Sequence, residues 1–252
     1  MASPRPDAEQ ARRPSRGVPE VQARPRRSWR PRLRRLVGRA LLLALLGPLL
    51  LIVLFRFVPP VLTPLMVIRL IQGYGLHREW IAYEDIAPAL AQAVISAEDN
   101  LFCEETLGFD FAAMRGQIET WSNGERPRGA STITMQTAKN LLLWPGRDPV
   151  RKVVEAWLTP QIAVLWPKRR VLEVYLNIVE FGPGVYGAGT AARRFFGKVP
   201  SQLSPREAAL LAAVLPRPLE WSAASPAPHV RQRAAIIERR VGQIRPLLAC
   251  AR

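Results

Sequence analysis

An uncharged apolar stretch near the start of the chain restricts its possible folds more than any other feature. Ala40–Phe55 reads ALLLALLGPLLLIVLF, and after Arg56 the apolar sequence resumes as FVPPVLTPLMVI. Its 16 residues fall short of the roughly 20 that span a bilayer core, but Arg56 can extend its guanidinium to the interface while its stem stays in lipid,. The sequence therefore predicts a transmembrane helix over residues 40–60 and a membrane-proximal segment over residues 61–78.

Positive charge is concentrated before this stretch. Residues 1–39 hold 12 arginines against 3 acidic residues, a net charge of +9 out of +16 for the whole chain of 252 residues. The same tail is rich in proline and poor in aliphatic side chains, which predicts disorder. Because positively charged flanks stay on the cytoplasmic side, we expect a cytoplasmic N-terminus and a folded domain, residues 79–252, on the opposite face. The charge is then a topology signal, and we expect no nucleic-acid binding.

Two other interpretations of the apolar stretch are weaker. A buried core helix would rarely follow so charged a tail. A cleaved signal peptide would need a small-residue cleavage site, where this chain instead has Pro59, Pro60 and Pro64,. An uncleaved anchor is the better prediction.

Cysteine and histidine are scarce. The chain has 2 cysteines and 2 histidines, too few to indicate a disulfide framework or a dense Cys/His metal site,. Cys103 and Cys250 could pair in an oxidising compartment or remain as two buried thiols, because their separation in sequence gives no distance between them. Both alternatives stay open at this point.

The pattern beyond residue 79 predicts a mainly α-helical domain. Apolar residues recur at helical spacing, and no repeated strand pattern or internal repeat is present. Ser204 and Glu207 form the sequence signature of a capping box at one helix start. The expected helices cover residues 85–97, 111–121, 150–157, 169–178, 187–196 and 205–214.

Glu98 and Asp99 are the first candidates for chemistry. They follow an apolar helix and precede Leu101 and Phe102, which should screen at least one carboxylate from water and raise its pKa, as a general base requires. A solvated acidic pair at a helix end is the ordinary alternative. The dipeptide alone does not decide between them.

A second group of candidates combines cations with a carboxylate. On a helix, Arg151 and Lys152 lie on the same face as Glu155, and Lys139 is close in sequence, so a diphosphate could dock there. The alternative is a surface ion pair of small energetic value.

Polar side chains in two further segments could line or support a groove. In residues 129–140 the candidates are Ser131, Thr132 and Gln136, with Ser131 as a helix cap in the simpler interpretation. Tyr175, Asn177 and Glu180 lie near a glycine-rich break and could brace a site, although a core helix followed by a loop explains them equally.

These segments occur together in the order of one family. They are AEDNLF, GFD, RGASTITMQTAKNLLLWPGR, RKVVEAWLT, KRRVLEVYLNIVEFGPGVYG, AARRFFGK and EAALLAAVLPRP, spread over residues 80–218. With the preceding span, they make the chain resemble the peptidoglycan glycosyltransferases of glycosyltransferase family 51, in particular the monofunctional members. The resemblance implies a mainly helical, lysozyme-like domain in the periplasm, anchored in the bacterial inner membrane, with a membrane-embedded small lobe to which residues 61–71 could contribute.

The resemblance also implies roles for individual residues. Glu98 matches the general base that takes a proton from the 4-hydroxyl of the acceptor, lipid II, as this oxygen attacks the growing strand and undecaprenyl diphosphate leaves. Glu155 matches the second glutamate on the donor side, where Arg151, Lys152 and Lys139 would neutralise the leaving group. The remaining matched positions, expected to line the cleft, are Asp99, Ser131, Thr132 and Gln136.

The resemblance has two departures and leaves alternatives. The usual motif histidine is missing from FCEETLG, and Met135 replaces one of two usual glutamines.

A lytic enzyme of the same fold and a catalytically weak membrane scaffold are the competing functions. No cofactor is expected, although Mg²⁺ or Mn²⁺ could bind at the diphosphate. The expected partners are lipid II, the growing strand and the membrane, together with separate cell-wall transpeptidases and division proteins, because 252 residues leave no room for a transpeptidase domain.

Overall fold

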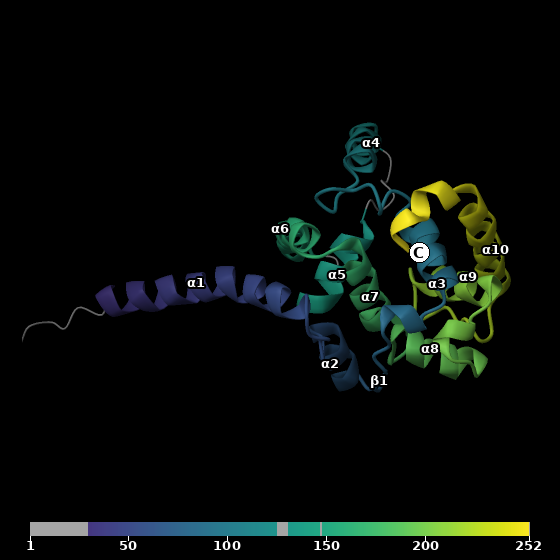
Figure 1. The fold of residues 1–252 in the computed structure, drawn as a ribbon. Helices are drawn as coiled ribbons and strands as arrows, with labels where there is room; N and C mark the ends of the chain where they lie inside the picture. The colour runs from purple at the N-terminus through teal and green to yellow at the C-terminus, as the bar shows by residue number, and fades with distance from the viewer. Residues whose placement is uncertain (1–29, 125–130, 147, 252) are drawn as a thin grey trace, which may run out of the picture. The chain divides into compact units, whose positions relative to one another are not determined.

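The computed structural model describes residues 30–124, 131–146 and 148–251. It separates into two units, residues 1–41 and residues 42–252, and the second contains the folded domain. The domain is mainly helical, as the sequence predicts, and Figure 1 shows its helices labelled in chain order. Its helices after the first are α2 (Pro64–Ile71), α3 (Pro88–Glu98), α4 (Phe111–Ser122), α5 (Ile133–Leu142), α6 (Pro149–Leu165), α7 (Lys168–Ile178), α8 (Gly187–Phe196), α9 (Pro205–Val214) and α10 (Pro228–Gln243).

The first helix, α1 (Arg30–Phe55), contains the apolar stretch. Its residues 32–55 are long and apolar enough to cross a membrane, and no other helix among the described residues passes the same test. The helix begins ten residues earlier than the expected span, so the prediction of disorder is wrong for residues 30–39. Arginine and leucine are good helix formers, and the apolar helix that follows supplies the nucleus from which these residues continue. The rest of the predicted disordered tail, residues 1–29, lies outside the described residues.

The end of α1 is fixed to the folded domain by hydrogen bonds. The Trp166 indole donates to the carbonyl of Ile52 at 2.8 Å, and the Arg170 guanidinium donates to the carbonyl of Phe55. Arg56 donates to the carbonyl of Leu165, the last residue of α6. These contacts hold the domain next to the point where the apolar helix ends.

Three short strands form a small sheet that the sequence pattern does not reveal. They are β1 (His77–Arg78), β2 (Glu180–Gly182) and β3 (Val185–Tyr186), in the order β1-β3-β2. β1 runs parallel to β3, with His77 opposite Val185, and β2 runs antiparallel to β3. Strands of two or three residues are too short to show the alternating pattern by which strands are recognised in a sequence.

The hydrophobic core lies between α3, α5, α7, α8 and α9. α3 packs against α9 and α10, whereas α5 packs against α6 and α7. Leu90, Ile95, Leu172 and Leu211 are fully buried in this core. The packing therefore brings together the end of α3, the start of α5 and the face of α7, which carry the candidate site residues.

Helix boundaries agree with the sequence where local signals are strong. The helix expected over residues 187–196 and the one over 205–214 have these bounds in α8 and α9, and Ser204 and Glu207 form the expected capping box. The helix expected from residue 85 begins at Pro88 instead, after a single 3-10 turn, η1 (Tyr83–Asp85). The proline ring disfavours a helical conformation at the preceding residue, Ala87, which is extended here,.

Candidate active site

Glu98 is the last residue of α3, and its carboxylate receives contacts from two other helices. Gln136 of α5 donates to Oε2 at 3.0 Å, and Arg233 of α10 lies 3.4 Å from Oε1. The Tyr175 hydroxyl of α7 donates to the Gln136 side chain at 2.9 Å and holds its amide in place. The structure therefore joins three residues singled out in the sequence into one hydrogen-bonded chain that ends at Glu98.

Burial raises the pKa of Glu98, and the hydrogen bond from Gln136 and the positive charges of Arg233 and Lys139 oppose this rise. The side chain remains 15% exposed, so a substrate hydroxyl can reach it. A carboxylate with a raised pKa that is still accessible has the properties of a general base.

A cavity of about 320 Å³ lies beside Glu98. Its lining includes the hydroxyl groups of Ser131 and Thr132, the carboxyl groups of Asp99 and Asp110, and the cation of Arg240 from α10. A neighbouring cavity of about 390 Å³ is lined by Arg233 and Arg240, among others. Polar groups of both signs around a concave surface suit a sugar with its hydroxyl groups.

The α10 arginines are the site residues that sequence reasoning missed. Arg233 and Arg240 are seven residues apart, so they lie on the same face of a helix two turns apart,. This periodicity is visible in PHVRQRAAIIERR, but the sequence does not show which face of the helix meets α3.

Glu155 of α6 is buried beside two cations. Its Oε2 lies 2.5 Å from Arg151 and its Oε1 lies 2.7 Å from Lys152, and the Lys152 ammonium also donates to the Ser131 hydroxyl at 2.9 Å. Asp148 caps α6 by accepting from the backbone N–H of Arg151. The predicted cluster of Arg151, Lys152 and Glu155 is therefore assembled on the first two turns of α6.

Lys139 connects the two glutamates electrostatically. Burial lowers the pKa of Lys139, whereas the negative charges of Glu155 and Glu98 raise it. Both carboxylates therefore lie within range of one ammonium group on α5. Lys139 also lines a third cavity, of about 200 Å³, together with Gln136 and Glu180.

The predicted supporting residues differ in what they support. Tyr175 donates to Gln136, which in turn donates to Glu98. Asn177 does not reach the site: its amide accepts from the N–H of Ile81 at 2.8 Å and donates to the carbonyl of the same residue, which fixes the segment before α3. Glu180 forms an ion pair with Arg69 of α2 at 3.4 Å, and burial raises its pKa.

The cap of α5 is Thr132 and not Ser131. The Thr132 hydroxyl accepts from the N–H of Met135 and donates to the carbonyl of Gly108 at 2.7 Å. Ser131 lies one residue before this cap and contacts Lys152 instead. The Thr132 hydroxyl therefore makes two hydrogen bonds, one that caps α5 and one to Gly108, whose φ is +74°,.

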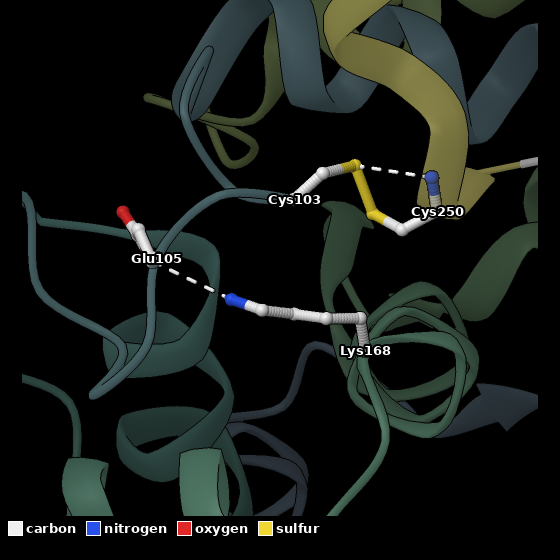
Figure 2. Close-up of a disulfide and its surroundings, with 4 residues drawn as sticks. All are labelled: Cys103, Glu105, Lys168 and Cys250. Carbon is white, nitrogen blue, oxygen red and sulfur yellow. Dashed lines mark hydrogen bonds and ion pairs between the residues drawn. A yellow bond between two sulfur atoms is a disulfide. The ribbon is translucent and has the colours of Figure 1, made fainter.

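The loop that departs from the resemblance, residues 101–108, is covalently fixed. Cys103 and Cys250 form a disulfide that links this loop to η3 (Arg245–Ala251), which decides the alternative that the sequence left open. Figure 2 shows the disulfide next to Glu105 and Lys168. The segment that follows Glu98 is thus attached to the C-terminal end of the chain.

Comparison with known proteins places the chain in a family. Residues 66–241 match the transglycosylase family, and the chain belongs to it. It is 46% identical over 213 residues to the biosynthetic peptidoglycan transglycosylase of Caulobacter vibrioides, with 84% of this chain and 93% of that protein covered. The protein of the same name from Rhodospirillum centenum is 49% identical over 218 residues, covering 85% and 92%. The one from Rhizobium meliloti is 46% identical over 226 residues, covering 89% and 95%.

Proposed function

We propose that the chain is a peptidoglycan glycosyltransferase that polymerises lipid II into glycan strands. The transglycosylase family and the names of the relatives support this function. The observation that carries it is the arrangement of two glutamates around Lys139, with an accessible base on one side and a cationic cluster on the other.

In this mechanism Glu98 accepts the proton of the acceptor 4-hydroxyl. The oxygen attacks the anomeric carbon of the donor, and undecaprenyl diphosphate leaves from the opposite face. A single displacement inverts the anomeric centre, so an α-linked diphosphate becomes a β-1,4 bond. The Tyr175–Gln136 chain holds Glu98 in the orientation that receives the proton.

The cations on α5 and α6 favour transfer over hydrolysis. A lytic enzyme acts on a neutral glycosidic bond and has no leaving diphosphate to stabilise. Lys139, Arg151 and Lys152 lie around Glu155, where they can offset the charge of a diphosphate as it departs,. We propose that no cofactor is required; a divalent cation, Mg²⁺ or Mn²⁺, would bind through the diphosphate oxygens.

A lipid-linked substrate also explains the apolar surface of the domain. Val150, Val153, Trp157 and Val164 of α6 are exposed at positions that share one face of the helix,. On α2, Val67, Leu70 and Ile71 are exposed as well. We propose that these side chains contact the membrane, so that the undecaprenyl tail stays in lipid while its diphosphate reaches the donor side.

We propose that α1 anchors the protein in the inner membrane with its N-terminus in the cytoplasm and the domain in the periplasm. The arginines before the span support this orientation. The Cys103–Cys250 disulfide supports it as well, since such bonds persist in the oxidising periplasm and not in the cytoplasm,. Separate transpeptidases and division proteins are the partners that we propose.

The orientation can be tested in cells. A C-terminal fusion to a phosphatase that is active only after export should be active, and the matching fusion to a truncated chain that lacks residues 30–58 should not be. Activity of the second fusion alone would contradict the proposed topology.

The function can be tested with labelled lipid II and the full-length protein in detergent. We expect long strands from the unaltered protein, resolved by gel. Lys152→Met should lower the rate of strand formation by about tenfold or more, because one of the charges that offset the diphosphate is lost. Lys198→Met is the matched control, since Lys198 is similarly exposed and pairs with Glu207 away from the site. A folded protein that binds lipid II and makes no strands would contradict the function and favour a scaffold.

A further inference from the structure

Glu105 is a buried carboxyl group that the mechanism does not use. It lies in the loop after Glu98, and its side chain is 2% exposed. Its nearest cation, the Lys168 ammonium at the start of α7, is 4.0 Å from Oε2, too far for a hydrogen bond (Figure 2),. Among the described residues, neither carboxyl oxygen of Glu105 has a hydrogen-bond partner.

Asp99 is the other carboxyl group in this cluster. It is buried, and its Oδ2 accepts from the backbone N–H of Ile133, the first residue of α5, at 2.8 Å. The carboxyl groups of Asp99 and Glu105 lie close enough to each other for a hydrogen bond if one of them carries a proton,. Two carboxylates cannot form such a contact unless one of them carries a proton, because an ionised carboxylate is only an acceptor.

The proton belongs on Glu105. Asp99 already accepts from a backbone N–H, which favours its ionised form, whereas Glu105 has no such donor,. A neutral Glu105, an ionised Asp99 and a protonated Lys168 together carry no net charge, which suits a buried cluster. The ammonium of Lys168 also lies 4.5 Å from the centre of the Phe102 ring, which helps hold it there,.

The titratable neighbours of Glu105 agree with this assignment. Burial raises the pKa of Glu105 to about 8, the negative charges of Asp99 and Asp110 act in the same direction, and the charge of Lys168 opposes them. Burial likewise raises the pKa of Asp99, which the hydrogen bond from Ile133 and the contact with Glu105 lower. Burial and the neighbouring negative charges thus favour the neutral form of Glu105.

We propose that Glu105, in its neutral form, is a positioning residue for strand polymerisation. It donates a hydrogen bond to Asp99, and Asp99 fixes the turn after Glu98 to the first turn of α5. This turn holds the base, and α5 carries Gln136 and Lys139, so the contact sets the distance between the base and the groups that orient it. This inference rests on the proposed function only in its first test, which measures strand formation.

The first test compares Glu105→Gln and Glu105→Ala in strand formation across about pH 6 to 9. The amide introduced by Glu105→Gln keeps a donor to Asp99 and cannot ionise. We expect this variant to keep near-normal kcat at neutral pH. In the unaltered enzyme, ionisation of Glu105 should lower kcat above about pH 8, and this fall should be absent from Glu105→Gln. Any fall in kcat that remains would come from Lys139 and Lys168, because burial lowers the pKa of both.

Glu105→Ala removes the donor, and we expect a fall in kcat of about tenfold with little change in KM, since the substrates do not contact this residue. Glu104→Gln is the matched control, because Glu104 is the exposed neighbour in the same loop. Equal pH profiles for the unaltered and Glu105→Gln enzymes, or normal kcat in Glu105→Ala, would overturn the proposal.

A second measurement does not depend on polymerisation. The unfolded chain loses the Glu105 proton near the usual pKa of 4.5, and the folded chain loses it at about 8. Stability should therefore fall as pH rises between these values, and this component should be absent in Glu105→Gln. The infrared absorption of protonated carboxyl groups at pH 7 should likewise be weaker in Glu105→Gln than in the unaltered protein, by the contribution of one group. Equal absorption in the two proteins would show that Glu105 is not the proton carrier, even if the enzyme makes no strands.

Discussion

Replacing Glu98 by glutamine should reduce strand formation from lipid II by about a thousandfold. The amide has nearly the same size and can still bond to Gln136, but it cannot accept the proton of the attacking hydroxyl. Because the side chain is kept in shape, we expect the variant to fold and to bind lipid II normally. The measurement is the initial rate of strand formation at saturating labelled lipid II, with binding followed separately.

Glu119→Gln is the matched control for this variant, since Glu119 is exposed on α4 and outside the site. The pH dependence gives a second check. Glu98 acts as a base only when ionised, and burial raises its pKa, so the rate of the unaltered enzyme should rise with pH through a value above the usual glutamate range,. A Glu98→Gln enzyme that polymerises at the normal rate would remove Glu98 from the mechanism.

Removing the disulfide should have the largest effect on stability. The Cys103–Cys250 bond closes a loop with a sequence separation of 147 residues. Constraining so long a loop in the unfolded chain stabilises the folded state by about 2–5 kcal/mol. We expect the Cys103→Ala, Cys250→Ala double variant to lose this amount in denaturant unfolding of the detergent-solubilised protein.

The control for the disulfide is a reducing agent. It should destabilise the unaltered protein by a similar amount and leave the double variant unchanged, because the variant has no bond to reduce. Activity should fall in parallel at elevated temperature, since the bond holds the loop that carries Glu105. Equal denaturant midpoints of unfolding for the double variant and the oxidised protein would show that the rest of the packing fixes this loop without the disulfide.

Local signals in the sequence predicted several elements well. The bounds of α8 and α9, and the capping box of Ser204 and Glu207, were accessible because caps and helical periodicity involve residues only three or four positions apart,. The same signals failed at Pro88, where the proline delayed the helix start, and at the α6 end, where the helix continues to Leu165 beyond the expected residue 157. Pro160 is a break signal in the later part of α6, but the helix continues through it,.

The sequence predicted which residues belong to the candidate site, but not which of them contact one another. Glu98, Gln136 and Tyr175 are separated by about forty residues from one to the next, and only the packing of α3, α5 and α7 joins them. Asn177 is two residues from Tyr175 and points to Ile81, because residues two apart on a helix face different directions,. Nothing in the sequence distinguishes these two polar residues.

By itself, the sequence determined that the chain has an apolar helix and a mainly helical domain, and its resemblance to one family implied a diphosphate-releasing transferase. The first two properties follow from composition and periodicity, which are local. Only the tertiary structure decided that Cys103 pairs with Cys250, that Arg233 reaches Glu98, and that Glu105 is buried against Asp99 and Lys168. Such contacts depend on the relative placement of distant segments, and burial, which sets the protonation of Glu105, exists only once they have packed together.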